Sequence, residues 1–285
     1  MIMINDIYYQ RGYADPVFED AYVLDLVRPF AADAKQVTAV DETGGEARTY
    51  AIDSDVILKV QRPQQLRLST SLEKEVFFLN QLRGIVGLNV PKVLGYGKEG
   101  TVEYTLMTRM PGTAVRYTQL TQDERESALF DLGKMLTLIH SLDIEPFLSS
   151  GLFFDIDKTS ADISDRLKYL FERALMRLSD KLSSAQIDKA KSEASELLSG
   201  IKNTYAVPCH ANPGPDHTFV TNSKLSGIID FADAYISHPI FDIRRWPLDD
   251  RKHVISGYIS AKKTDTDFKV VCDISTALDN ILAKL

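Results

Sequence analysis

Residues 209–234 read CHANPGPDHTFVTNSKLSGIIDFADA and combine a polar loop, two β-rich runs and a following carboxylate. The turn residues 221–224 separate the two β-rich runs, so the stretch predicts a hairpin. A hairpin returns the chain to the edge from which it started, and His217 and Asp230 lie at its two ends. We therefore expect these side chains to meet where they can bind a divalent cation.

The residues by themselves allow two other interpretations of this stretch. In the first, His210 and His217 are ordinary loop histidines and Asp230 caps a helix. In the second, Cys209, His210 and His217 bind zinc, although their spacing matches no zinc motif. Both alternatives stay open at this point.

The chain on either side separates into a strand-rich part and a helical part. The patterns predict strands over 37–40, 48–52, 56–61, 92–96 and 101–108, and helices over 16–30, 71–83, 122–142, 162–178, 184–200 and 266–285. The run Met110-Pro111-Gly112 breaks the chain between the two parts. We therefore expect an α+β fold with an N-terminal lobe, residues 1–110, and a C-terminal lobe, residues 111–285.

Composition excludes several classes of protein. The 285 residues include 33 Lys and Arg against 40 Asp and Glu, a net charge of −7, which argues against binding to nucleic acid or to an anionic membrane. The N-terminus lacks the features of a secretory signal, and no apolar run approaches the ~18 residues that span a bilayer. Two cysteines cannot form a disulfide framework. We expect a soluble protein of a reducing cytoplasm.

One glycine motif is a false lead. Residues 95–100, GYGKEG, match the dinucleotide pattern GxGxxG, which requires a helix directly after it. The residues that follow, TVEYTLM, are typical of a strand instead. We expect a hairpin turn here and no nucleotide at these glycines.

Residues 210–242 resemble the catalytic region of the aminoglycoside and macrolide phosphotransferases, relatives of choline kinase and of protein kinases. That pattern reads H-G-D-L-x-P-G-N-x-L-V, then G-x-I-D-W/F-x-D/E-A, then P-x-x-D. Here His210 matches the leading histidine, residues 227–231 (GIIDF) match the metal-binding strand, and residues 239–242 (PIFD) match the close. The resemblance covers about residues 40–270 and implies a bilobal, protein-kinase-like fold with a β-rich N-terminal lobe and a larger helical C-terminal lobe.

The resemblance also implies a binding site for ATP or GTP in the N-terminal lobe. Gly44 and Gly45 would belong to the loop that covers the nucleotide, and Lys59 would hold its phosphates. Glu75 lies in a segment, EVFFLNQL, that matches the E-x-x-x-L-x-x-L helix of the family, so it would pair with Lys59. Glu73 is the alternative partner for that lysine.

Further residues acquire roles from the same resemblance. Thr108 and Met110 lie in the segment that matches the hinge strand, whose backbone would contact the adenine. His217 and Asp230 would bind Mg²⁺, with His217 standing where many relatives have Asn. Histidine at that position favours the macrolide-directed branch. His140 matches a common pattern in the family, and we interpret it as structural.

The chain departs from the pattern at the catalytic aspartate, because Asn212 occupies that position. An amide accepts a hydrogen bond from a substrate hydroxyl but cannot take its proton. Three explanations stay open: Asp216 supplies the carboxylate, the chain binds nucleotide without transferring phosphate, or Asn212 is an introduced inactivating substitution. The resemblance implies an enzyme that moves the γ-phosphate of ATP or GTP to a hydroxyl of a small molecule, with His210, Asn212 and Asp216 as candidate catalytic residues. The alternative is a silent sensor of nucleotide or ligand. An acidic chain would suit a cationic acceptor.

Overall fold

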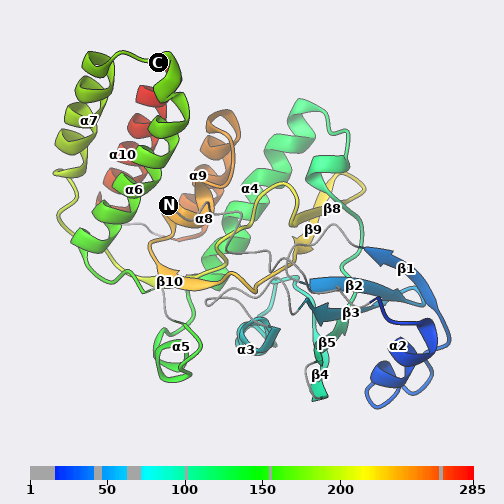
Figure 1. Cartoon of the computed structure of the whole chain (residues 1–285). Coiled ribbons are helices and arrows are strands. Elements are labelled where there is room, and N and C mark those ends of the chain that lie inside the picture. The colour runs from blue at the N-terminus through cyan, green and yellow to red at the C-terminus, as the bar shows by residue number, and fades with distance from the viewer. Residues whose placement is uncertain (1–16, 42–46, 63–71, 100–101, 154–155, 263–265) are drawn as a thin grey trace. The chain divides into compact units, whose positions relative to one another are not determined.

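The structure, a computed structural model, describes residues 17–41, 47–62, 72–99, 102–153, 156–262 and 266–285 (Figure 1). By their contacts the residues divide into unit 1, from residues 1–119 and 215–234, and unit 2, from residues 120–214 and 235–285. The hairpin expected after His217 therefore groups with the strand-rich unit. The lobe boundary expected near Met110 stays a prediction, because contacts group residues without defining folding domains.

Unit 1 contains an antiparallel sheet with the strand order β1-β2-β3-β5-β4 (Figure 1). Its strands are β1 (Val37–Asp41), β2 (Ala47–Ile52), β3 (Val56–Gln61), β4 (Val93–Glu99) and β5 (Val102–Thr108). These bounds lie close to the predicted ones. Strands β4 and β5 pair antiparallel with Glu99 opposite Val102, so residues 95–99 of the GxGxxG match lie in a strand, and a strand follows them instead of a helix, as expected.

Two helices of unit 1 accompany this sheet. Helix α2 (Asp20–Val27) buries Val23, Leu26 and Val27 against residues of β2, β3 and β5. Burial of apolar side chains on one helix face explains why this short helix is stable only on the sheet. It is shorter than the predicted 16–30, and the expected cap at Asp15 lies outside the described residues. Helix α3 (Leu72–Gln81) agrees with the prediction to within two residues at each end.

A second, three-stranded sheet in unit 1 has the order β6-β8-β9. Its strands are β6 (Thr113–Ala114), β8 (Thr218–Thr221) and β9 (Lys224–Ile228), and the 3₁₀ helix η2 (Val115–Tyr117) follows β6. Gly227 lies so close to the Asn89 carbonyl and to Met110 Sδ that a Cβ would approach them to 2.5 and 2.6 Å. Glycine is required there because no side chain fits.

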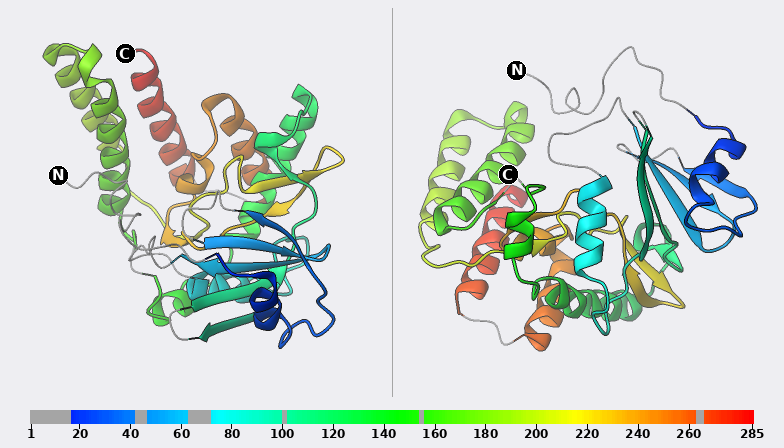
Figure 2. Two further views of the ribbon diagram at one scale, coloured as in Figure 1. Left: turned by 45° about the vertical axis from the view of Figure 1, so that its right-hand side comes forward. Right: turned by 90° about the horizontal axis from the view of Figure 1, so that it is seen from below.

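The described part of unit 2 is mainly helical. Its helices are α4 (Gln122–Ile139), α5 (Glu145–Ser149), α6 (Ser160–Leu178), α7 (Ser184–Leu198), α8 (Ile240–Ile243), α9 (Leu248–Ala261) and α10 (Thr266–Ala283), with the 3₁₀ helix η3 (Ser179–Lys181) after α6. Helices α6, α7 and α10 lie side by side (Figures 1 and 2). Capping boxes at Thr121, Thr159 and Ser183 begin α4, α6 and α7.

Helices α4 and α9 form the most extensive helix pair of unit 2. Two glycines allow their close approach: a Cβ at Gly133 would overlap the Val254 carbonyl, and one at Gly257 would overlap that of Phe130. The sequence patterns did not predict α9, because its first turns are polar and it contains a glycine. Packing on α4 therefore determines this helix.

A two-stranded sheet, β7 (Val207–Cys209) with β10 (Tyr235–Ser237), was not predicted either. Both strands have three residues, too few for a periodic pattern, and β7 contains Pro208. The pair fixes where the loop after Cys209 begins. None of the described helices is long and apolar enough to cross a membrane. The α+β fold class expected from the sequence is confirmed.

Candidate functional site

Lys59 is the centre of a charged cluster in unit 1. It lies on β3, on the face opposite the buried Leu58 and Val60. Its ammonium Nζ contacts the two carboxylate oxygens of Glu75 at 2.9 and 3.0 Å and Oδ1 of Asp230 at 2.8 Å. Strand β3, helix α3 and the segment after the β8–β9 hairpin thus each contribute one side chain to this cluster.

Lys59 is held in its charged form, whereas burial raises the pKa of Glu75 above its usual value. Burial alone would lower the pKa of Lys59, but the charges of Asp230 and Glu75 outweigh it and raise this pKa above its usual value. Glu75 is fully buried and also accepts a hydrogen bond from the Phe231 N–H at 3.2 Å. The Phe231 ring packs on Phe78 of α3 with ring centroids 5.1 Å apart. This packing fixes the segment that carries Asp230 against the helix that carries Glu75.

His217 and Asp230 lie together, as the hairpin predicts. His217 Nε2 is 3.5 Å from Asp230 Oδ2, and the Ile229 N–H donates to the His217 carbonyl at 3.0 Å. Asp230 has a φ of +73°, a left-handed conformation that is strained for most residues and tolerated by Asp. One carboxylate and one imidazole can contribute two ligands to a divalent cation, which would need phosphate oxygens or water to complete its coordination. The residues present therefore fit such a cation.

The zinc alternative finds no support in the geometry. Cys209 Sγ lies in a buried group with His140 and Asp242, and the thiol donates to the carbonyl oxygens of Ser237 and His238. Burial raises the pKa of the Cys209 thiol well above its usual value, so the thiol keeps its proton and acts as a donor here. His217 belongs to the cluster in unit 1 and not to this group.

In unit 2, Asp242 holds the loop that begins at His210. Its Oδ2 accepts from the His210 N–H at 2.8 Å and contacts His140 Nε2 at 3.0 Å, and its Oδ1 accepts from the Ala211 N–H at 2.7 Å. The His140 Nδ1 lies 3.2 Å from the hydroxyl of Tyr258. A fully buried carboxylate thus fixes two consecutive peptide groups of the loop.

Asp242 remains ionised in this environment. Burial would raise its pKa, but the hydrogen bond and charge of His140, together with the His210 N–H, lower it below its usual value. An ionised carboxylate only accepts, so the Nε2 of His140 carries a proton that it donates to Asp242. The sequence pattern placed Asp242 in a motif without assigning it this role, and His140 is structural, as interpreted above.

Asn212 lies at the centre of that loop. Its N–H donates to His210 Nδ1 at 3.1 Å, and the preceding residue, Ala211, has a φ of +78°. The family pattern has glycine at this left-handed position, which explains the preference for a residue without Cβ. Two residues that the sequence analysis missed also contact the loop: Trp246 Nε1 donates to the Pro213 carbonyl at 2.7 Å, and Arg245 Nε to that of Ala211. The single tryptophan was the available signal, because a buried indole N–H needs an acceptor.

Asp216, the alternative candidate for the catalytic carboxylate, forms an ion pair with Arg116. Arg116 is in η2, and its N–H donates to the Pro215 carbonyl at 3.0 Å. By contacts Asp216 groups with unit 1, whereas Asn212 groups with unit 2. The ion pair therefore gives Asp216 a structural contact at the start of the β8–β9 hairpin.

The residues predicted to contact the nucleotide differ in their hydrogen bonds and in whether the structure describes them. The Thr108 N–H donates to the Lys92 carbonyl at 2.9 Å, and its Oγ1 accepts from the Lys92 N–H at 2.9 Å. Met110 is buried with its Sδ near Gly227, and within the described ranges no hydrogen bond engages its own N–H. Gly44 and Gly45 lie outside the described residues.

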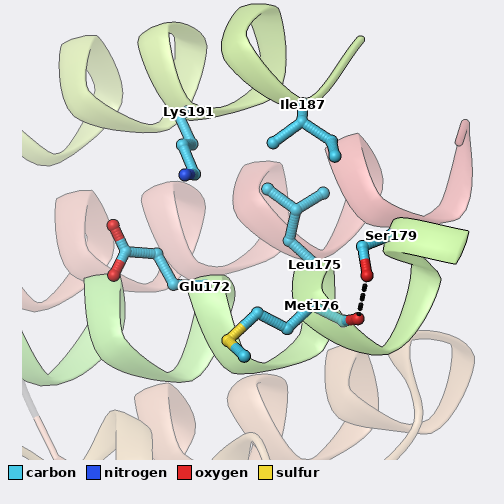
Figure 3. A pocket seen from close by; sticks show the side chains of 6 residues that line it. All are labelled: Glu172, Leu175, Met176, Ser179, Ile187 and Lys191. Carbon is cyan, nitrogen blue, oxygen red and sulfur yellow. Dashed lines mark hydrogen bonds between the residues drawn. The ribbon is translucent and has the colours of Figure 1, made fainter. Parts of the chain in front are cut away.

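A pocket of about 300 Å³ lies elsewhere, between α6 and α7 (Figure 3). Apolar side chains of Leu175, Met176 and Ile187 line its middle, and Glu172 and Lys191 lie at one end. It contains none of the site residues predicted from the sequence. We interpret it as a groove between two helix faces.

Comparisons with known proteins agree with these motifs. The profile of the phosphotransferase enzyme family (APH) matches residues 37–261, whereas no curated protein matches the chain significantly. Among solved structures, the GDP complex of wild-type aminoglycoside 2′-phosphotransferase-IIIa matches with a TM-score of 0.66 and 18% identity, over 93% of this chain and 90% of that one. The streptomycin–ATP ternary complex of APH(2″)-IIa matches with a TM-score of 0.60 and 18% identity, over 94% and 92%.

A macrolide enzyme also matches. The apoenzyme of macrolide 2′-phosphotransferase from Brachybacterium faecium has a TM-score of 0.62 at 16% identity, over 92% of this chain and 89% of that one. The structural matches confirm the expected protein-kinase-like α+β fold, which aminoglycoside and macrolide phosphotransferases share. Because the family profile covers most of the sequence, the chain belongs to the phosphotransferase enzyme family.

Proposed function

We propose that this chain transfers the γ-phosphate of ATP or GTP to a hydroxyl group of a small molecule. The observation that carries the proposal is the contact of Lys59 with both Glu75 and Asp230. Phosphoryl transfer needs a cation that is fixed near the phosphates and a carboxylate for the metal. In this cluster Lys59 is such a cation and Asp230 is such a carboxylate, and the two are in direct contact.

The nucleotide would bind to unit 1. Lys59 would contact its phosphates, Glu75 would keep Lys59 in position, and the backbone at Thr108 and Met110 would face the base. Gly44 and Gly45 would cover the phosphates. Support comes from the structural neighbours, which include a GDP complex and an ATP complex. We leave ATP and GTP as equal candidates.

Asp230 and His217 would hold Mg²⁺. When bound, the ion would neutralise charge on the phosphate oxygens. Asp230 also contacts Lys59, so the residues that would hold the metal and those that would hold the phosphates are coupled.

Two buried free thiols, Cys209 and Cys272, are consistent with a reducing cytoplasm.

The acceptor hydroxyl would approach Asn212. The carboxamide can accept a hydrogen bond from that hydroxyl and orient it, and the loss of a base would cost on the order of 10²–10⁴ in rate. His210 supports the position of Asn212 through its Nδ1. Asp216 remains the candidate for a carboxylate that replaces the missing base. Matched structures include complexes with streptomycin, kanamycin and gentamicin, and macrolide enzymes, so we propose an antibiotic-like or metabolite acceptor.

Asn212 also favours a second candidate function, a protein that binds nucleotide without transferring phosphate. Both candidates predict a thermal shift with Mg²⁺ and ATP or GTP that Lys59→Ala abolishes. Without such a shift in the wild type, both fail. Turnover on a panel of kanamycin, gentamicin, streptomycin and erythromycin separates them.

Variants of the two candidate residues complete this test. Turnover by the wild type that Asp216→Ala abolishes would identify Asp216 as the base and exclude the silent protein. Turnover that persists in Asp216→Ala assigns the acceptor position to Asn212. Activity that appears only in Asn212→Asp supports the silent protein.

A further inference from the structure

The backbone on both sides of Asn212 is held by side chains with no role in the proposed reaction. Trp246 Nε1 donates to the Pro213 carbonyl, and Arg245 Nε donates to the Ala211 carbonyl. Asp242 and His210 already hold the N–H groups of the same loop. Carbonyl and amide groups of the loop are therefore both engaged.

The segment that carries Arg245 and Trp246 is itself anchored. Arg251 of α9 is buried, and its Nη2 donates to the carbonyl oxygens of Arg244 at 3.3 Å and Trp246 at 3.2 Å. Its Nη1 pairs with Asp279 of α10 at 2.7 Å. Hydrogen bonds therefore connect α10 and α9 to the backbone that bears the two donors. Donors on a rigid backbone hold their acceptors in one place.

The two donors differ in burial. Trp246 is 1% exposed, so water cannot replace its donor when the indole N–H is removed. Arg245 is exposed, and water can substitute for part of its hydrogen bond. Trp246 is therefore the principal contact, and Arg245 assists it.

We propose that Trp246, assisted by Arg245, is a positioning residue that keeps Asn212 where its carboxamide orients the acceptor hydroxyl. The inference rests on the proposed phosphotransfer. An amide cannot take a proton, so orientation is the contribution that Asn212 can make, and it depends on a fixed backbone.

Hydrogen exchange on the full chain tests the positioning without nucleotide or acceptor. In Trp246→Phe, which retains an aromatic ring, the amides of 209–212 and 214 should exchange at least tenfold faster, while those of α6 and α7 keep their rates. Arg245→Gln, at an exposed position, should show a smaller increase. Lys252→Gln, at an exposed position of α9, is the control. Wild-type exchange rates of the loop in both variants would overturn the proposal.

Turnover on the acceptor found in the panel above tests the consequence for the reaction. Trp246→Phe should lower kcat about ten- to hundredfold while KM for the nucleotide changes less than twofold. Lys252→Gln should keep kcat within twofold. A loosened loop with unchanged kcat would overturn the positioning role. Absence of turnover in the wild type would instead refute the proposed function, and the exchange experiment would still decide whether Trp246 and Arg245 hold the loop.

Discussion

Replacing Asp242 by asparagine should destabilise unit 2 strongly. The carboxylate accepts from the N–H groups of His210 and Ala211 and from His140 Nε2. In the Asp242→Asn variant an NH₂ group replaces one of the two carboxylate oxygens. The N–H group that donated to that oxygen then faces another donor and loses its acceptor. Loss of one hydrogen bond to a charged group costs about 1.5–3 kcal/mol, and a buried unsatisfied donor about 1–3 kcal/mol. The two costs together predict that the free energy of unfolding falls by about 3–5 kcal/mol.

Urea unfolding at pH 7, followed by fluorescence of the single tryptophan in unit 2, measures this change. The pKa of Asp242 is lower in the folded protein, so its stabilisation is present above its unfolded pKa of about 3.9 and is lost as the pH falls through the folded value. The difference between variant and wild type should therefore be full at pH 6–7 and shrink below about pH 4. Asp249→Asn, at the exposed start of α9, should cost less than about 1 kcal/mol. A loss below about 1 kcal/mol in Asp242→Asn would refute the reasoning.

Three further changes give measurable outcomes. Gly257→Ala should destabilise the α4–α9 pair by about 3 kcal/mol in urea unfolding, because the new Cβ overlaps the Phe130 carbonyl; a loss under about 0.5 kcal/mol would contradict the packing. Ala211→Gly should stabilise unit 2 by about 0.5–1 kcal/mol, since relief of the left-handed strain exceeds the added backbone entropy of glycine; a lower melting temperature would count against it. Glu75→Gln should reduce the thermal shift that Mg²⁺ and ATP produce, because Lys59 loses a charged partner, whereas Glu73→Gln, at an exposed position, should leave it unchanged; equal shifts in both would refute the assignment.

The sequence predicted most of the long elements because their burial patterns are local. The strands of the five-stranded sheet and helices α4, α6, α7 and α10 agree with the expected ranges to within about three residues at each end. Helix α9 escaped prediction because its apolar residues are sparse and its stability comes from packing on α4. Strands β7 and β10 escaped because three residues show no period.

The site was predictable where residues follow a motif. Lys59, Glu75 and Asp230, separated by many residues, are in contact, and His217 lies beside Asp230. The contact of Asp216 with Arg116 was not predictable, because it pairs residues of two loops that no pattern relates. The same holds for the hydrogen bond from Trp246 to Pro213.

The order of the motifs, the α+β class and the absence of the expected aspartate at Asn212 are properties of the sequence alone, because each depends on residue type and local spacing. The motif indicated Glu75 as the partner of Lys59 and left Glu73 as the alternative; the face of α3 that packs inward brings Glu75 to Lys59, and this is a property of the tertiary structure. Asp242 gains its role in the same way: burial leaves its carboxylate as the acceptor for two loop N–H groups, and a charge buried among donors stays ionised.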